Sequence, residues 1–200
     1  QGLGFTAAVF ESVSGWTTTG LSVIDLGATS PMILLWRSLM QLGGGAGFAI
    51  LMLSLMTGPI GAGLSEAEGR GEQLAPHVRK SARLVLEIYA GYAVLGIAAY
   101  ALCGMSLADA VNHAFAAIST GGFSTRPESI GFWDSAGIEA VSIALMVLGN
   151  LNFLTAYLIL RGRWRAASRS GELRLAGLLA AAGAASLFFL VTSATAGSLG

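Results

Sequence analysis

The stretch of sequence that decides the fold is SLADAVNHAFAAISTGGFST, residues 106–125. It opens with Ser106, which is followed three residues later by Asp109, a start typical of a helix capping box. The apolar run that continues to residue 118 allows about three helical turns, too few to cross a bilayer. The polar, glycine-bearing residues 119–125 follow at once and cannot comfortably continue a helix. The stretch therefore predicts a short helix and a non-helical loop.

The surrounding chain has the composition of an integral membrane protein. Of its 200 residues, 54% are hydrophobic and 11% are charged, whereas about 25% are charged in soluble domains. The 28 glycines agree, because small residues let helices approach closely in lipid. The formal net charge is zero, so nothing indicates a nucleic-acid partner. Because the sequence begins at Gln1 and ends within an apolar run, we expect both of its ends to be cut.

Four apolar runs are long enough to cross a bilayer as helices, for which about 20 residues are needed. With at most one charge in each, they are residues 31–56, 84–105, 136–160 and 175–200. Ser30 and Pro31 give the first run a helix start, a capping hydroxyl followed by proline at the first helical position.

Nine of the eleven basic residues lie between these runs, within residues 70–83 and 161–174. The positive-inside rule places both segments in the cytoplasm. The two spans between them must then be joined outside the cell, so residues 106–135 are predicted to be external. A short helix and polar loop in that position are typical of a re-entrant element, since irregular backbone lies at membrane depth only within protein or beside a water-filled cavity.

A second copy of the same pattern occurs in FTAAVFESVSGWTTTGLSVI, residues 5–24. It predicts a short helix over residues 5–16, a polar loop and then the first full span. Aligning Thr19-Gly20 with Thr120-Gly121 gives an internal repeat of about 100 residues. A five-residue shift then aligns Gly43 with Gly149 in the spans that follow.

The residue types in both loops suit a bare monovalent cation. Backbone carbonyls can replace the hydration oxygens of an ion, and glycine lets the backbone turn those carbonyls toward it. The short helices direct the negative ends of their dipoles toward the same place, which favours cations. The predicted selectivity-filter residues are Thr18, Thr19, Gly20, Ser119, Thr120, Gly121 and Gly122. No carboxylate lies within either loop, unlike divalent-cation filters built from acidic rings.

Several motifs, in this order, resemble the Trk/Ktr/HKT superfamily of potassium transporters, and within it the Trk membrane subunits. They are TTTG (17–20), WRSLMQ (36–41), GGGAG (43–47), HAF (113–115), STGGFST (119–125) and NF (152–153). The resemblance implies that Gly20 and Gly121 are the filter glycines of two repeats. In plant relatives serine at the first of these positions accompanies sodium preference, so glycine implies potassium.

The resemblance also implies a pore of four such loops, of which this chain has two, and potassium as the transported ion with no covalently bound cofactor. It implies a homodimer in the bacterial inner membrane that sits on a cytosolic nucleotide-binding regulatory ring. The basic segments within residues 70–83 and 161–174 are candidates to contact that ring.

The predicted fold class is therefore all-α integral membrane, with repeated units of span, re-entrant pore helix with filter loop, and span. The predicted organisation is residues 1–57 for the pore helix, filter loop and second span of repeat one, 58–83 for a cytoplasmic loop, 84–160 for repeat two, 161–174 for a second cytoplasmic loop and 175–200 for the first span of a third repeat.

Arg37 lies about two turns inside a predicted span, where an unpaired charge costs about 2.5 to 3.5 kcal/mol or more. We expect it to support a filter loop by bonding loop carbonyls or Glu11; the alternative is that it snorkels outward from the helix end. The glycine run 43–47 is either a hinge or a site of close helix packing. His113 is predicted to be a packed, hydrogen-bonded side chain, because no second histidine or cysteine has ligand spacing to it.

Two other functions stay open. A secondary transporter with broken helices would couple a monovalent cation to substrate movement, although its repeats are often inverted, whereas both loops here open to the same side. An intramembrane enzyme would use Ser119 or Ser14 as nucleophile and His113 as base, but no orienting carboxylate is evident. The predicted function is potassium uptake through a carbonyl-lined filter.

Overall fold

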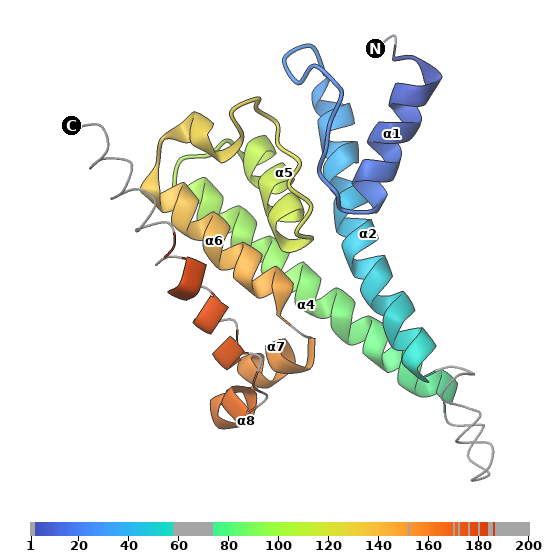
Figure 1. The fold of residues 1–200 in the computed structure, drawn as a ribbon, viewed down its shortest axis with the longest axis vertical. Helices are drawn as coiled ribbons and strands as arrows, with labels where there is room; N and C mark the ends of the chain where they lie inside the picture. Colours follow the sequence, from blue (N-terminus) through green and yellow to red (C-terminus); the bar gives the residue numbers. More distant parts are fainter. Residues whose placement is uncertain are drawn as a thin grey trace. The chain divides into compact units, whose positions relative to one another are not determined.

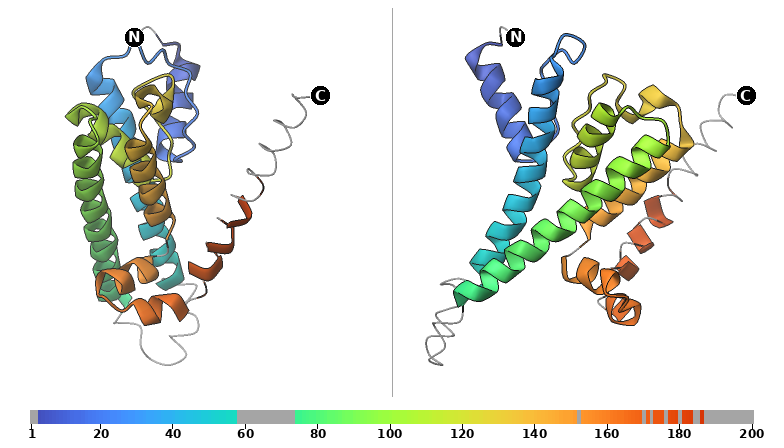
Figure 2. Two further views of the ribbon diagram at one scale, coloured as in Figure 1. Left: turned by 90° about the vertical axis from the view of Figure 1, so that its left-hand side faces the viewer. Right: turned by 180° about the vertical axis from the view of Figure 1, so that it is seen from behind.

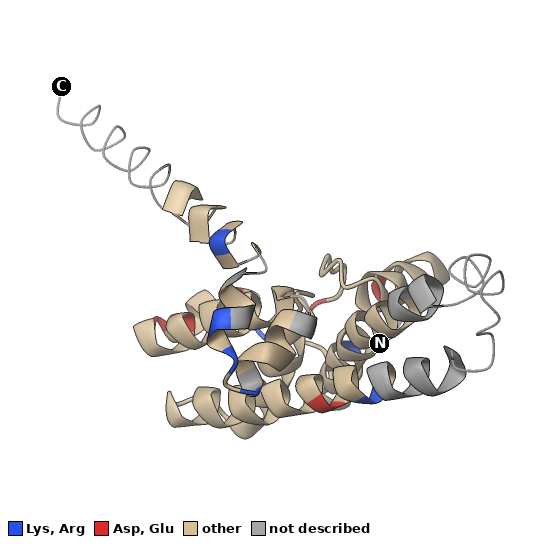
Figure 3. Ribbon diagram, turned by 90° about the horizontal axis from the view of Figure 1, so that it is seen from below, with Lys and Arg blue, Asp and Glu red and all other residues tan. Residues whose placement is uncertain are grey.

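A computed structural model describes residues 3–57, 74–151 and 153–169, together with scattered residues between 171 and 186. The chain divides into two compact units, residues 1–150 and 151–200. All regular secondary structure in the described ranges is helical. Most of the described helical ribbon bears no charged residue (Figure 3).

The first unit contains two long helices and several shorter ones (Figure 1). Its elements are α1 (Phe5–Trp16), α2 (Pro31–Thr57), α4 (Leu74–Leu102), α5 (Leu107–Ile118), a 3-10 helix η3 (Ser129–Trp133) and α6 (Ala136–Asn150). Helix α1 packs on α2, and α5 packs against α2, α4 and α6. Both short helices lie at the same end of the unit and run from that end toward its middle (Figures 1 and 2).

Helices α1 and α5 have the bounds that the sequence predicts. At the start of α5, the Ser106 hydroxyl oxygen accepts a hydrogen bond from the backbone N–H of Asp109 at 3.1 Å. The same hydroxyl donates to the Asp109 carboxylate at 2.8 Å, which completes the predicted cap. The small side chains of Ala110 and Ala114 are fully buried, so neighbouring helices approach the α5 backbone closely.

Helix α2 begins at Pro31 as predicted and continues without a break to Thr57. Its 27 residues correspond to about 40 Å of helix. The glycine run 43–47 is therefore not a break in α2, because the helix passes straight through it. The alternative, close packing, is the one that the contacts of these glycines support.

Helix α4 begins at Leu74, ten residues before the predicted span, so the last part of the predicted loop 58–83 is helical. Residues 58–73 of that loop lie outside the described residues. By length and apolar composition together, one helical stretch in the described part of the chain is a candidate membrane span, Ala82–Leu102, with 21 residues and a mean hydropathy of 1.6.

The predicted span 136–160 is two helices instead of one. Helix α6 ends at Asn150, and α7 (Phe153–Leu160) begins after Leu151 and residue 152. Asparagine and glycine are poor helix formers, and Gly149, Asn150 and Asn152 are clustered here, which accounts for the interruption. In the second unit α7 packs with α8 (Trp164–Arg169), which lies in the predicted loop 161–174. The predicted span 175–200 falls mostly outside the described residues.

Candidate functional site

The loop after α1 begins with a specific helix ending. The N–H of Thr18 donates to the carbonyl of Gly15 at 3.1 Å, and the N–H of Thr19 donates to the carbonyl of Ser14 at 3.0 Å. Thr18 has a φ of +53°. This is the Schellman arrangement, in which a left-handed residue turns the chain sharply away from the helix axis. We call residues 17–24 loop one.

Helix α5 ends in the same way. The N–H of Thr120 donates to the carbonyl of Ala117 at 3.1 Å, and the N–H of Gly121 donates to the carbonyl of Ala116 at 2.8 Å. Thr120 has a φ of +52°, which matches that of Thr18. Residues 119–126, called loop two, therefore leave their helix with the same backbone path as loop one.

Threonine at the left-handed position is the unusual feature of both loops. At the left-handed position after α4 the residue is Gly104, with a φ of +98°. After α7 it is Gly162, with a φ of +68°. Glycine adopts this conformation without steric penalty, whereas a β-branched residue costs about 1 to 3 kcal/mol and is retained mainly at functional sites. Among the described residues, Ser129 and Asp134 at the 3-10 helix η3 also have positive φ, but neither of them is β-branched.

The backbone corrects the alignment of the repeats by one residue. Gly20 has a φ of +79° and Gly122 has a φ of +81°, so these two glycines are equivalent. The sequence alignment of Thr19-Gly20 with Thr120-Gly121 is therefore wrong, because loop two has an additional glycine in the place of Thr19. Gly121 is a glycine for a different reason: a side chain at this position would overlap a neighbouring residue.

The two loops meet at Gly20 and Gly121. A Cβ atom on Gly20 would overlap the carbonyl oxygen of Gly121. A Cβ atom on Gly121 would in turn overlap the side-chain amide of Gln41, which comes from α2. Two glycines that are 101 positions apart in the sequence thus lie in direct contact, and the second is held between loop one and helix α2.

Each short helix ends in contact with a glycine of another helix, α1 against α2 and α5 against α6. A Cβ atom on Gly44 of α2 would overlap the carbonyl oxygen of Trp16, the last residue of α1. A Cβ atom on Gly149 of α6 would overlap the carbonyl oxygen of Ile118, the last residue of α5. Gly44 therefore matches Gly149, so the predicted match of Gly43 with Gly149 is also wrong by one residue.

Arg37 and Glu11 form a buried ion pair beneath loop one. Their side chains are 3% and 8% exposed, and Nε of Arg37 lies 2.7 Å from Oε1 of Glu11. The Ser22 hydroxyl donates to Glu11 at 2.9 Å, and the N–H of Val23 donates to it at 3.0 Å. Arg37 also donates to the Ser22 hydroxyl at 2.9 Å. The pair therefore fixes the far end of loop one, and the snorkelling alternative is wrong.

The same face of α2 reaches loop two. Arg37 donates to the backbone carbonyl of Ser124 at 3.5 Å, and its guanidinium carbon lies 3.9 Å from the centre of the Phe123 ring. One residue further along, the Ser38 hydroxyl donates to the Asn112 side chain of α5 at 2.6 Å. Helix α2 is thereby attached to the second short helix as well as to the first.

His113 occupies in α5 the position that Glu11 occupies in α1. Its Nε2 lies 3.0 Å from the Ser124 hydroxyl, just as Glu11 binds the hydroxyl of Ser22. Its Nδ1 lies 2.8 Å from the carbonyl oxygen of Asp109. The Ser119 hydroxyl instead donates to the carbonyl of Phe115 at 2.7 Å, so the structure does not bring this serine and His113 together as a nucleophile and its base.

The hydroxyls of Thr19 and Ser14 bond locally. The Thr19 hydroxyl lies 2.8 Å from the Thr17 hydroxyl. The Ser14 hydroxyl donates to the carbonyl of Leu21 at 2.6 Å. Within the described residues, no group of three His, Cys, Asp or Glu side chains could hold a metal ion. The oxygens available to an ion in the loops are therefore backbone carbonyls and hydroxyls.

Gln41 is a residue of the site that the sequence analysis did not single out. It is 0% exposed, and its Oε1 accepts a hydrogen bond from the backbone N–H of Phe123 at 3.2 Å. Gln41 lies one helical turn beyond Arg37, within the motif WRSLMQ. A polar residue on the same face as a buried arginine was the signal that would have identified it.

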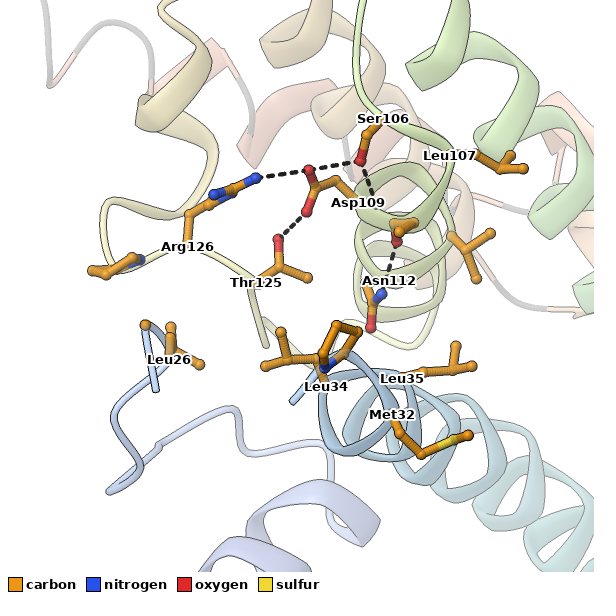
Figure 4. A pocket seen from close by; sticks show the side chains of 15 residues that line it. Leu26, Met32, Leu34, Leu35, Ser106, Leu107, Asp109, Asn112, Thr125 and Arg126 are labelled. Carbon is orange, nitrogen blue, oxygen red and sulfur yellow. Dashed lines mark hydrogen bonds and ion pairs between the residues drawn. The ribbon is translucent and has the colours of Figure 1, made fainter. Parts of the chain in front are cut away.

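A hydrogen-bonded cluster around the Asp109 carboxylate fixes the end of loop two (Figure 4). The Asp109 carboxylate accepts hydrogen bonds from the Thr125 hydroxyl at 2.6 Å and from Arg126 at 3.2 Å. Burial raises the pKa of the Asp109 carboxyl, but the bonds from Thr125, Ser106 and Arg126 outweigh burial, so this pKa lies below its ordinary value.

A mainly apolar cavity of about 870 Å³ lies beside this cluster, away from the loop glycines.

A family model described as cation transport protein, TrkH, matches residues 1–175. The Trk system potassium uptake protein TrkH of Halomonas elongata is 36% identical over 165 residues, which are 79% of this chain and 34% of the relative. The corresponding protein TrkG of Escherichia coli is 35% identical, with the same coverage. The chain therefore spans about a third of the length of these relatives.

Structural comparison gives a consistent match. The crystal structure of the potassium transporter TrkH from Vibrio parahaemolyticus superposes on this chain with a TM-score of 0.67 and 30% sequence identity. The match covers 78% of this chain and 31% of that structure.

Proposed function

The chain belongs to the TrkH family of cation transport proteins, all-helical membrane transporters, and on that premise we propose that its two loops form half of a potassium-selective filter. The observation that carries the proposal is the matched backbone of the loops. Each has a threonine and a glycine with positive φ, two residues apart, and the loops touch at Gly20 and Gly121.

The alternation of φ explains how such loops would bind an ion. Thr18 and Gly20 have positive φ, and Thr19 between them does not. The N–H groups of Thr18 and Thr19 both donate to carbonyls at the end of α1, so these successive N–H groups lie on the same side of the chain. The carbonyl groups of the same trans peptides then face the opposite side. A row of carbonyl oxygens on one side of each loop is what a cation without its hydration water requires.

The helices add to the attraction. Both α1 and α5 end at a loop, so the negative ends of two helix dipoles lie close to the proposed filter. With a selective path for K⁺ in place, the membrane potential supplies about 2.3 kcal/mol per charge per 100 mV for uptake. No covalent chemistry by the protein is needed, and potassium is substrate rather than cofactor.

The organisation proposed for the whole protein follows the relatives. Residues 1–57 and 84–160 would be parts of repeats one and two of a pore with four loops in the bacterial inner membrane, with residues 58–83 and 161–174 in the cytoplasm and residues 175–200 beginning a third repeat. A homodimer on a cytosolic nucleotide-binding subunit is the proposed assembly. The alternative, a secondary transporter with inverted repeats, fits less well because α1 and α5 run in the same direction (Figure 2).

Rubidium uptake tests the proposed function. The full-length gene product would be expressed in cells that lack their own potassium uptake, and ⁸⁶Rb⁺ accumulation would be measured with increasing Na⁺ as competitor. We expect uptake that Na⁺ inhibits weakly. The variant Gly122→Ser places a side chain in open space but at an unfavourable φ, so we expect lower uptake or stronger Na⁺ inhibition. Absence of uptake by the wild-type protein at normal membrane levels would refute the proposal.

A further inference from the structure

Gln41 is buried against loop two although it belongs to the first repeat. Its side-chain amide lies against Gly121, and its Oε1 accepts the N–H of Phe123. Its Nε2 finds no hydrogen-bond partner within the described residues. A buried N–H group without a partner lowers stability, so the free energy of folding alone does not explain why this position is a glutamine rather than a leucine.

The bond to Phe123 has a direct geometric consequence. The peptide group that joins Gly122 to Phe123 is trans. In a trans peptide the N–H and C=O groups point in opposite directions. Since the N–H of Phe123 points at Gln41, the carbonyl of Gly122 points away from α2. Gln41 therefore determines the direction of the carbonyl group that belongs to the positive-φ glycine of loop two.

Among the described residues, no equivalent contact from α2 reaches the same position of loop one. There the carbonyl of Leu21, the counterpart of Phe123, accepts a hydrogen bond from Ser14 of its own helix. The counterpart of Ser14 in α5 is Ala116, which has no hydroxyl. Loop two therefore lacks this anchor from its own helix and receives the Gln41 amide at the adjacent peptide group instead.

We infer that Gln41 is a positioning residue that sets the ion selectivity of loop two from the neighbouring repeat. The inference rests on the proposed function, because it assigns the Gly122 carbonyl to the ion path. Gln41 does not touch the ion. It fixes the plane of the peptide group that joins Gly122 to Phe123, whose carbonyl oxygen is assigned to the ion path.

Three variants of the full-length gene product test the inference by ⁸⁶Rb⁺ uptake with Na⁺ competition, each at matched membrane levels. Gln41→Leu replaces the amide with an apolar side chain that is one atom shorter, and it removes the acceptor for the N–H of Phe123. We expect a roughly fivefold fall in the preference for K⁺ over Na⁺, the size of one ordinary hydrogen bond. Gln41→Glu keeps an acceptor oxygen and should retain more of the preference than Gln41→Leu. Gly47→Ala, on the same helix as Gln41 and with nothing within 4 Å of the added atom, is the control and should leave the preference unchanged.

Thermal unfolding of the same variants separates positioning from general stability. Gln41→Leu exchanges one unpaired polar group for another, so we expect its midpoint to stay close to that of the wild type while its selectivity falls. Wild-type selectivity in Gln41→Leu, with altered selectivity in Gly122→Ser, would overturn the inference and leave the proposed function standing. If Gln41→Leu does not reach the membrane, the selectivity of Gln41→Glu tests the inference instead. A loss of selectivity in Gln41→Glu as complete as in Gly122→Ser would contradict the role of the acceptor oxygen. Absence of uptake by the wild type would instead remove the proposed function itself.

Discussion

Loop one and loop two have the same backbone but are held by different parts of the chain. Loop one is anchored mainly from its own helix: Ser14 and Glu11 bond residues 7 to 12 positions away. Loop two is bonded by His113 and Asp109 of its own helix, and it also receives two bonds from α2 that join residues 82 and 87 positions apart. Helix α2 of the first repeat therefore holds the loop of the second.

The difference explains how the proposed pore would join its repeats. A loop that depended only on its own helix would keep its shape but not its distance from the next loop. Arg37 contacts both loops, and Gln41 contacts the second close to where Gly20 of the first approaches it. One face of one helix thus contacts both loops, and in the proposed filter it would set their spacing. The following variants separate its local and inter-repeat contributions.

The largest expected effect is that of Arg37→Gln, which removes the group that the two loops share. Glu11 would remain buried without its partner, and breaking such a pair costs about 3 to 5 kcal/mol. We expect a strongly reduced yield of folded protein and altered ion selectivity in what remains. The double variant Glu11→Gln, Arg37→Gln should be less unstable than Arg37→Gln alone, as measured by thermal unfolding in detergent. Wild-type yield and selectivity in Arg37→Gln would contradict the shared role.

Gly44→Ala should have the next largest effect, because its methyl group would overlap the carbonyl of Trp16. Forced overpacking of this kind costs about 1 to 3 kcal/mol. Gly47→Ala is the matched control on the same helix, where nothing lies within 4 Å of the added atom. Unfolding midpoints of the two variants should differ clearly. Equal midpoints would show that α1 does not end against Gly44.

Ser14→Ala sharpens the comparison of the two loops. It removes the bond to the Leu21 carbonyl, for which loop two has no counterpart, and should cost about 1 kcal/mol, the net value of one hydrogen bond. The reciprocal change Ala116→Ser gives loop two a hydroxyl that its anchoring does not need. We expect Ser14→Ala to reduce Rb⁺ uptake at matched membrane levels and Ala116→Ser to do so less. The reverse order would refute the assignment of local anchoring to loop one.

The smallest expected effect concerns Asp109. Because the pKa of this carboxyl is lowered in the folded protein, its contribution to stability is fully present above its unfolded pKa of about 3.9 and is lost as the pH falls through the lower folded value. The difference in unfolding midpoint between wild type and Asp109→Asn should therefore be constant from pH 7 to 5, values chosen to lie well above that range. If the difference in unfolding midpoint changes between pH 7 and 5, the pKa of Asp109 in the folded protein is not below its ordinary value.

Sequence reasoning predicted what depends on neighbouring residues. The bounds of α1 and α5, the start of α2 at Pro31 and the polar loops all follow from capping residues, periodicity and glycine. The hypothesis that Arg37 pairs with Glu11 followed from the cost of a buried charge.

Three features could not be predicted in this way. The register of Gly20 with Gly122 depends on backbone dihedrals, which two adjacent glycines leave ambiguous in the sequence. The role of Gln41 depends on a contact across 82 positions. The interruption between α6 and α7 depends on a few weak helix formers whose effect tertiary packing can override in either direction.

The central claim, that the carbonyl rows of two contacting loops replace the hydration of a potassium ion, is tested most directly by locating the ion. The full-length gene product would be crystallised in Rb⁺, and anomalous scattering would be recorded at the rubidium edge. The account predicts a peak within coordinating distance of backbone oxygens of residues 18–20 and 120–122. A well-ordered structure with both loops resolved and the rubidium peaks elsewhere would contradict it.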